Sequence, residues 1–336
     1  MAAVLIRGEG IAGTCCSRLL GHSGLDLTVE KLRRPKLPAV MLGETTQKLL
    51  RDVFDRGDLF DGLPQIHRRV VAWGRDSAPV TLPHSAVVVS EQTLLDRIHQ
   101  PSHQTEQPEG REPDWTIFAS PPLRPSSVEH HFGSRPAAAS PVRLEPACHA
   151  DACWIESLED GWLFLLPGGE GTAWLLSVGG AAESLLDASR LIRGQIAELY
   201  PSRGTFASHP RIALPLSEPG WLACGTAAVG FDPLCGDGTG NATREAILGS
   251  AVVRAAIEGG DVESLVAHYQ ARLLAGFKRH IALCFDFYRS GNSGPWWNNQ
   301  LAELERGLAW CSEQLADGEA FRYRLNGFTL ERKMGS

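Results

Sequence analysis

The sequence predicts an α/β fold in which helices flank a parallel sheet, and three observations support it. An apolar run at residues 2–6 leads into a glycine-rich turn at residues 8–13 and then into a helical pattern. A second apolar run follows at residues 25–29, so strand and helix patterns alternate over the first part of the chain. Another glycine-rich run, residues 221–238, precedes a long helical pattern. Strands that are far apart in the sequence are therefore expected to share one sheet.

The first glycine-rich turn has the spacing of a dinucleotide-binding fingerprint. Gly8 permits a tight turn, Gly10 lets a phosphate approach the backbone, and Gly13 lets the helix pack closely on its strand. Free backbone N–H groups and the positive helix end would then hold a pyrophosphate, while Glu30 would accept hydrogen bonds from a ribose. The residues predicted to bind a cofactor here are Gly8, Gly10, Ile11, Ala12, Gly13 and Glu30.

The second glycine-rich run also predicts a ligand-binding turn before a helix. Asp232 and Pro233 favour a rigid turn, and Gly236 and Gly238 leave backbone N–H groups open at the helix N-terminus. The alternative is a purely structural turn between a strand and a helix. The residues predicted to bind a cofactor in this run are Gly225, Thr226, Asp232, Pro233, Gly236, Gly238 and Thr239.

Composition restricts the class of protein. A chain of 336 residues that is 43% hydrophobic can bury a substantial core, and two lobes are expected. A net charge of -7 argues against a nucleic-acid partner, and no apolar run approaches the roughly 20 residues of a membrane span. We see no signal peptide before the first strand. The eight scattered cysteines indicate a reducing compartment, so we expect a cytoplasmic protein.

The middle of the chain has a different character from its beginning. Residues 70–73, 80–89 and 130–180 alternate like antiparallel strands, and residues 185–200 are expected to form an amphipathic helix. Residues 100–114 are polar and rich in proline, which predicts a loop. From residue 262 onward the pattern is helical and aromatic.

Six segments, in chain order, resemble the motifs of one family. They are residues 8–13, 42–46, 72–74, 160–167, 221–238 and 245–246. Together they resemble the FAD-dependent monooxygenase superfamily and, within it, the tryptophan-halogenase-like branch. That branch includes flavoproteins that modify tryptophan during the maturation of quinone cofactors.

The resemblance implies FAD as the cofactor and a particular division of the chain. It implies a discontinuous Rossmann-like FAD-binding lobe, a mixed or antiparallel sheet that forms the substrate lobe, and a helical C-terminal cap. The expected boundaries are 1–60, 90–125 and 205–260 for the FAD-binding lobe, 61–89 and 126–204 for the substrate lobe, and 261–336 for the cap.

The activity that the resemblance implies is hydroxylation of an electron-rich aromatic by a flavin C4a-hydroperoxide. The substrate would be an indole or tryptophan, either as a small molecule or within a partner protein, with electrons from NAD(P)H or a flavin reductase. Glu44 is a candidate acid, base or flavin-positioning group, although a carboxylate that only stabilises a helix N-terminus is the alternative. Thr45 would lie near the flavin, and Trp162 and Phe164 would wall the substrate tunnel.

The sequence departs from the family pattern at several positions. Thr226 replaces an aspartate, Glu91 stands near a position that is often arginine, and residues 114–120 lack a final glycine. Flavin halogenases use an active-site lysine, but there is no lysine between Lys48 and Lys278. Hydroxylation is therefore favoured. A halogenase, a flavin-dependent reductase or dehydrogenase, and a non-catalytic relative with weakened FAD binding are the alternatives.

A metal site is not expected. The pair His130-His131 and the group at residues 148–153 contain zinc-ligand residue types, but neither has a matching second pair at a suitable spacing.

Overall fold

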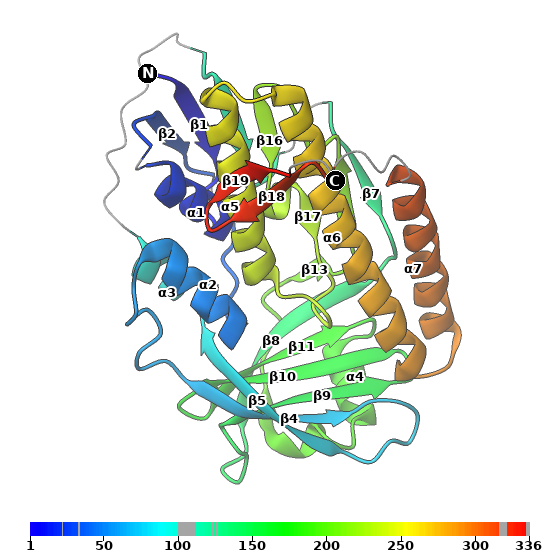
Figure 1. The fold of residues 1–336 in the computed structure, drawn as a ribbon. Coiled ribbons are helices and arrows are strands. Elements are labelled where there is room, and N and C mark those ends of the chain that lie inside the picture. Colours follow the sequence, from blue (N-terminus) through cyan, green and yellow to red (C-terminus); the bar gives the residue numbers. More distant parts are fainter. Residues whose placement is uncertain are drawn as a thin grey trace.

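The computed structural model describes residues 1–21, 23–32, 34–99, 112–122, 124, 126–315 and 321–333. A parallel sheet lies at one end of the molecule and a larger mixed sheet at the other (Figure 1). Helix α6 runs from the first end toward the second, and α7 lies beside it (Figure 1). Most of the loop predicted at residues 100–114 lies outside the described residues.

The parallel sheet is assembled from separated parts of the chain, as predicted. Its strand order is β15-β16-β6-β1-β2, and only the edge strand β15 is antiparallel to its neighbour. The strands are β1 (Ala3–Arg7), β2 (Asp26–Glu30), β6 (Trp115–Phe118), β15 (Ser217–Glu218) and β16 (Trp221–Ala223). Apolar side chains of β1, β6 and β16 are buried on both faces, as is usual for parallel strands. The helices α1 (Ile11–Leu20) and α5 (Gly238–Ile257) pack against each other.

The larger sheet has nine strands and is mixed. The order is β12-β8-β11-β10-β9-β4-β5-β3, with β13 also paired to β8, and only β4 and β9 run parallel. The strands are β3 (Val40–Gly43), β4 (Gln65–Ala72), β5 (Val80–Val89), β8 (Pro136–Leu144), β9 (Ala152–Leu158), β10 (Gly161–Gly169), β11 (Thr172–Val178), β12 (Ile196–Leu199) and β13 (Thr205–Ala207). Most of the strands predicted over 70–73, 80–89 and 130–180 therefore lie in one sheet, whereas residues 130–131 belong to a separate small sheet.

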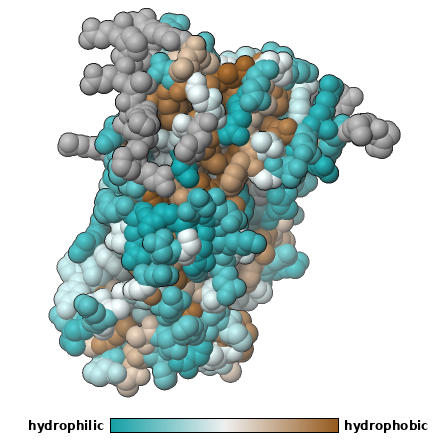
Figure 2. All heavy atoms as spheres, turned by 60° about the vertical axis from the view of Figure 1, so that its left-hand side comes forward, coloured by the Kyte–Doolittle hydropathy of each residue, from teal (hydrophilic) through white to brown (hydrophobic). Residues whose placement is uncertain are grey.

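The remaining elements connect and cover these sheets. A small sheet contains β7 (Val128–His131), β14 (Arg211–Leu214) and β17 (Val229–Gly230). The other helices are α2 (Glu44–Phe54), α3 (Glu91–Ile98), α4 (Ala182–Ala188), α6 (Val262–Gly291) and α7 (Pro295–Gln314). On the side that carries α2 and α3, hydrophilic side chains gather over the middle of the surface and hydrophobic ones show above them (Figure 2). Across the described residues, every helix is too short or too polar to span a membrane.

The prediction of a helix over residues 185–200 is wrong beyond the first turn of that helix. The chain leaves α4 at Ala188 and continues as a short 3₁₀ turn and strand β12. The buried carboxylate of Glu156 explains the change, because it accepts the backbone N–H groups of residues 190–192 at 2.8 to 3.1 Å. It also accepts the hydroxyl of Ser189. These bonds satisfy N–H groups that a longer helix would have used internally.

The C-terminal segment is helical only in part, which corrects the prediction of a helical cap over 261–336. After α6 and α7, strands β18 (Tyr323–Asn326) and β19 (Thr329–Arg332) form a hairpin. Its two-residue turn begins at Gly327, whose φ of 56° suits glycine. A cross-strand ion pair of 2.8 Å between Arg324 and Glu331 fixes the register.

A buried ion pair ties the mixed sheet to the helices. Arg135 Nε lies 3.1 Å from Asp232 Oδ2, and both side chains are completely buried. Tyr288 of α6 donates its hydroxyl to the same carboxylate oxygen at 2.9 Å, and Trp162 of β10 donates its indole N–H to Tyr288 at 3.1 Å. The network therefore links a strand, a helix and the turn before α5.

Removing the arginine of this network should destabilise the protein strongly. Arg135→Gln leaves the Asp232 carboxylate buried without its cation, which should lower the free energy of unfolding by about 3–5 kcal/mol. Arg143→Gln is the control, because its ion pair with Glu198 is exposed to solvent and its loss should change the stability much less. Urea denaturation at pH 7 measures both. Equal losses in the two variants would contradict this interpretation.

Candidate active site

The two glycine-rich runs lie in direct contact. Gly225 has a φ of 57°, and a Cβ added to it would lie 2.7 Å from the Cβ of Ala12 in α1. A Cβ added to Gly13 would lie 2.0 Å from the carbonyl oxygen of Gly8. These contacts leave no room for a side chain at either glycine. The turn after β1 and the turn after β16 therefore form one surface.

The first turn is flanked by a cation with an unused donor. The Arg34 guanidinium lies over Gly10, where an added Cβ would be 2.9 Å from Nη2. Arg34 forms an ion pair with the buried carboxylate of Glu91, which also accepts the N–H of Leu37 at 2.9 Å. Among the described residues, the buried Nε of Arg34 has no hydrogen-bond partner. An anionic group near Gly10 would find a free donor there.

Glu30 lies beside the first turn, where the sequence placed it. The N–H of Gly8 donates to the carbonyl of Glu30 at 2.9 Å. The Glu30 carboxylate accepts from Arg7 Nε at 2.7 Å and remains partly exposed, with 41% of the side chain accessible. Its oxygens therefore retain lone pairs for a further donor. Ser120 stands close to Gly8, since an added Cβ at Gly8 would lie 2.6 Å from the Ser120 hydroxyl.

A cavity of about 590 Å³ opens where α2 and α5 begin. Three residues predicted from the sequence, Glu44, Thr45 and Gly236, line this cavity together. Glu44 is the exposed first residue of α2, so both of its predicted roles remain available. Two glycines at these helix starts, Gly43 and Gly238, face open space, because an added Cβ would meet nothing within 4 Å.

Asp237 connects the two helix starts and was not among the residues predicted from the sequence. Its carboxylate caps α5 by accepting the N–H of Gly240 at 2.9 Å, and it also accepts the hydroxyl of Thr46. Arg244 lies 3.6 Å from the same carboxylate. An aspartate directly before a helical pattern is a helix N-cap signal, which could have identified it.

Arg69 of β4 and His84 of β5 line the same cavity and were also not predicted. Arg69 Nη2 lies 3.2 Å from His84 Nε2, and the buried Nε of Arg69 has no hydrogen-bond partner in the described part of the chain. Burial, followed by the charge of Arg69, lowers the pKa of His84. The imidazole is therefore neutral at pH 7 beside a permanent cation.

Two predicted site residues have side chains that are buried in the core, and their roles at the site stay predictions. Trp162 is 1% exposed, donates its indole N–H to Tyr288 and lies edge-on to Trp73 with ring centroids 6.5 Å apart, and it lines neither described cavity. Asp232 is fully buried because its carboxylate is held by Arg135 and Tyr288. Phe164 is half-buried on the same face of β10 as Trp162, and its place in a substrate tunnel stays a prediction.

The second turn rests on a buried carboxyl group. Thr226 is exposed in the 3₁₀ turn Gly225–Ala227, and its carbonyl accepts from Arg211 at 2.6 Å. Beneath it, Glu245 accepts the N–H of Gly225 at 2.6 Å. Burial raises the pKa of Glu245 to about 8. The carboxyl group is therefore largely protonated at pH 7.

Comparison with known proteins identifies the fold. No family model matches the chain, and no curated protein matches its sequence. Among solved structures, CmlS, a flavin-dependent halogenase, aligns with a TM-score of 0.76 and 17% identity over 99% of this chain and 84% of that one. QhpG, a peptidyl tryptophan dihydroxylase essential for tryptophylquinone cofactor biogenesis, aligns with a TM-score of 0.70 and 18% identity over 89% and 78%.

A hydroxylating enzyme aligns over a similar extent. The p-nitrophenol 4-monooxygenase PnpA from Pseudomonas putida DLL-E4 has a TM-score of 0.67 and 14% identity, over 96% of this chain and 98% of that one. The chain therefore has the fold of flavin-dependent halogenases and monooxygenases. The predicted resemblance to the FAD-dependent monooxygenase superfamily is confirmed at the level of the fold.

The protonation of Glu245 predicts a pH dependence of stability. Between the ordinary pKa of 4.5 in the unfolded chain and about 8 in the folded protein, the folded state holds one more proton. The buried, protonated Glu245 carboxyl group therefore contributes its full stabilisation below pH 4.5, and this contribution is lost as the pH rises toward 8. The loss is at most about 5 kcal/mol, at 1.4 kcal/mol per unit.

The variant Glu245→Gln tests this assignment, because its amide oxygen still accepts from Gly225 but does not titrate. Urea denaturation from pH 5 to pH 8 should show that the wild type loses more stability than the variant. Glu263→Gln, at an exposed position in the first turn of α6, is the matched control. A constant difference between wild type and Glu245→Gln over this range would show that Glu245 is ionised in the folded protein.

Proposed function

We propose that the chain is an FAD-dependent monooxygenase that hydroxylates an electron-rich aromatic. The observation that carries the proposal is the packing of two glycine-rich turns into one surface that ends at a cavity between the starts of α2 and α5. The similarity to flavin-dependent halogenases, a peptidyl tryptophan dihydroxylase and a hydroxylating monooxygenase supports this class of activity. The FAD-binding lobe would combine residues 1–60, 90–125 and 205–260.

The residues of these turns fit FAD. The backbone N–H groups of residues 8–13 and the unused Nε of Arg34 suit a pyrophosphate, and Glu30 suits the adenosine ribose. The open faces of Gly43 and Gly238 leave space for the flavin ring beside Glu44, Thr45 and the residues 236–239. Thr226 offers a neutral hydroxyl where relatives have a carboxylate, so a ribityl hydroxyl would gain a weaker partner.

FAD, when bound and reduced, supplies the activation of O₂. The chain supplies the surroundings. The N-terminus of α5 presents a positive potential that stabilises negative charge on a ligand, and Asp237 holds that helix start in place. Arg69 and His84 offer a cation and a neutral ring that would orient a substrate. Glu44 would hold or accept a proton at its carboxylate on the cavity wall.

The cationic side chains of this cavity favour hydroxylation over halogenation. Arg69 and Arg244 line it, but no lysine does in the part of the chain that the structure describes. A guanidinium keeps its proton at neutral pH and does not provide the neutral amine that a lysine can. The substrate would be a small indole or a tryptophan of a partner protein, and the electrons would come from NAD(P)H or a flavin reductase.

Product analysis under ¹⁸O₂ tests the reaction. The FAD-loaded protein is reduced and mixed with indole, tryptophan or tryptophan-containing peptides, with and without chloride or bromide. We expect a product that gains one oxygen atom derived from O₂ and that forms without halide. A halide-dependent product would indicate a halogenase, and turnover without O₂ a reductase or dehydrogenase. Failure to bind FAD at saturating concentration would indicate a non-catalytic relative.

Filling the open space at Gly43 should block FAD without harming the fold. In Gly43→Leu the new side chain points into the cavity and meets no protein atom within 4 Å at its Cβ, so FAD binding should weaken at least tenfold. Gly57→Leu is the matched control, because Gly57 also faces open space but lies outside the cavity. Flavin fluorescence titration and the melting temperature measure the two effects. Equal FAD affinity in both variants would place the flavin elsewhere.

A further inference from the structure

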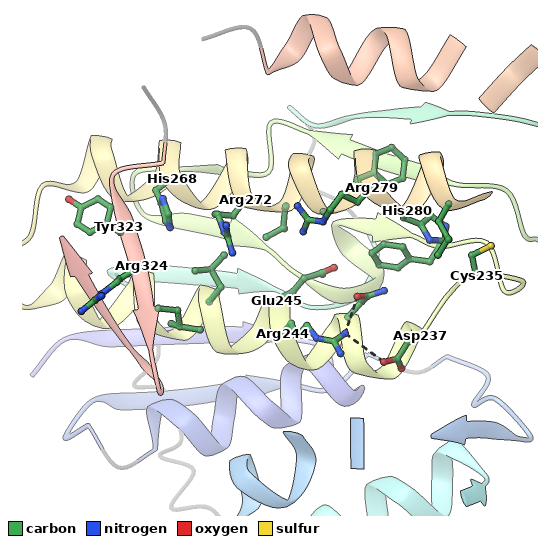
Figure 3. Close-up of a pocket in the computed structure, with 18 of the residues that line it drawn as sticks. Cys235, Asp237, Arg244, Glu245, His268, Arg272, Arg279, His280, Tyr323 and Arg324 are labelled. Atoms are coloured by element: carbon green, nitrogen blue, oxygen red, sulfur yellow. Dashed lines mark hydrogen bonds and ion pairs between the residues drawn. The ribbon is translucent and has the colours of Figure 1, made fainter. Parts of the chain in front are cut away.

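A second cavity, of about 750 Å³, lies between α5, α6 and the β18–β19 hairpin (Figure 3). One face of α6 supplies much of its wall, because residues 268, 272, 276, 279 and 283 recur at helical spacing. Arg272 points from α6 across the cavity toward α5, and Arg244 of α5 turns toward Asp237 (Figure 3). None of the residues predicted from the sequence to bind a cofactor lines this cavity.

The cavity carries an excess of positive charge. Within the described residues, the side chains of Arg272, Arg279 and Lys333 line it without any ion-pair or hydrogen-bond partner. The other two cations are neutralised, since Arg244 pairs with Asp237 at 3.6 Å and Arg324 pairs with Glu331 at 2.8 Å.

The acidic groups of the wall do not balance these three cations. Asp237 is already paired with Arg244, and the pKa of Glu245 is raised by burial to about 8, which leaves its carboxyl group largely uncharged at pH 7. His280 is neutral, because burial lowers its pKa to about 4. The cavity is therefore a site of positive potential.

Apolar side chains line the rest of the cavity. They are Phe231, Leu248, Leu273, Phe277, Leu283 and Tyr323. Leu325 of the hairpin also lines the cavity. Leu283 and Leu325 remain 46% and 41% exposed, which leaves hydrophobic surface for a ligand to cover. Gly276 adds space between the arginines, since an added Cβ there would meet only Arg279 Nη2 at 3.7 Å.

We propose that this cavity binds a phosphate ester with an aromatic or apolar body, of the nucleotide class. Guanidinium groups recognise phosphate through paired hydrogen bonds, and the apolar wall would hold the rings. A volume of about 750 Å³ lies within the range of small-molecule and cofactor sites. The cavity shares Asp237 and Arg244 with the cavity at Glu44, so its ligand would lie next to the proposed flavin site.

Two kinds of nucleotide ligand would fit this cavity, and experiment can distinguish them. One is a reduced nicotinamide nucleotide, which would be the electron donor, and this choice of source rests on the proposed function. The other is a nucleotide that has no role in electron transfer. The site itself follows from the cations and the cavity in either case.

Calorimetric titration of the full chain, with FAD present, tests the proposal. The probes are NADPH, ADP and inorganic phosphate. We expect NADPH or ADP to bind at least tenfold more tightly than inorganic phosphate, because only the nucleotides cover the apolar wall. Binding that is tighter for NADPH than for ADP would identify the nicotinamide nucleotide as the source, and equal binding would identify a general nucleotide site.

Variants place the binding in this cavity. The double variant Arg272→Gln/Arg279→Gln should weaken nucleotide binding at least tenfold. Arg289→Gln, on the same helix but outside the cavity, should leave it unchanged. Gly276→Leu should weaken binding to a similar degree while the melting temperature is kept or raised, because it fills space and removes a glycine from a helix.

The proposal is overturned if neither nucleotide binds, or if the double variant binds as tightly as the wild type. FAD binding is followed in the same samples by flavin absorbance. Loss of FAD binding with intact nucleotide binding would refute the proposed function and leave this site standing. Intact FAD binding without nucleotide binding would refute this nucleotide site and leave the proposed function standing.

Discussion

The two glycine-rich turns pack against each other so closely that their contact sets the position of the chain leading into α5. Gly225 meets Ala12 at a distance that excludes a side chain, and Gly13 meets the Gly8 carbonyl in the same way. Such an approach is available only to glycine, at a cost in conformational entropy that the surrounding core must offset. Because Gly225 follows β16, the contact fixes the chain that leads through the Asp232 turn into α5. The cavity at the start of α5 is a consequence.

Asp237 links the starts of α2 and α5 and lines both cavities. It caps α5, accepts the Thr46 hydroxyl from α2 and pairs with Arg244. The two cavities meet at Asp237 and Arg244, so charge that enters one of them changes the electrostatic balance of the other. This arrangement gives a physical route by which an anionic ligand between α5 and α6 would influence a ligand held near Glu44.

Local sequence signals predicted the parts of the fold that local physics controls. Glycine spacing and apolar runs predicted β1, α1, β2 and α5, and the alternation over 130–180 predicted the antiparallel strands β8 to β11. The structure brings predicted site residues together where backbone geometry places them: Glu44 and Gly236 line one cavity, and Glu30 lies beside the turn at Gly8. Contacts between distant side chains were not predicted: Glu156 ends α4, Arg69 meets His84, and Arg135 pairs with the buried carboxylate of Asp232. Such pairings are set by tertiary packing, which a single sequence does not display.

A crystal structure of the chain with FAD would show where the cofactor lies, which an affinity alone does not. We expect the pyrophosphate at residues 8–13 beside Arg34, with the flavin ring in the cavity lined by Glu44, Thr45 and Gly236. Crystals without FAD at saturating concentration, or with FAD only in the cavity between α5 and α6, would contradict it.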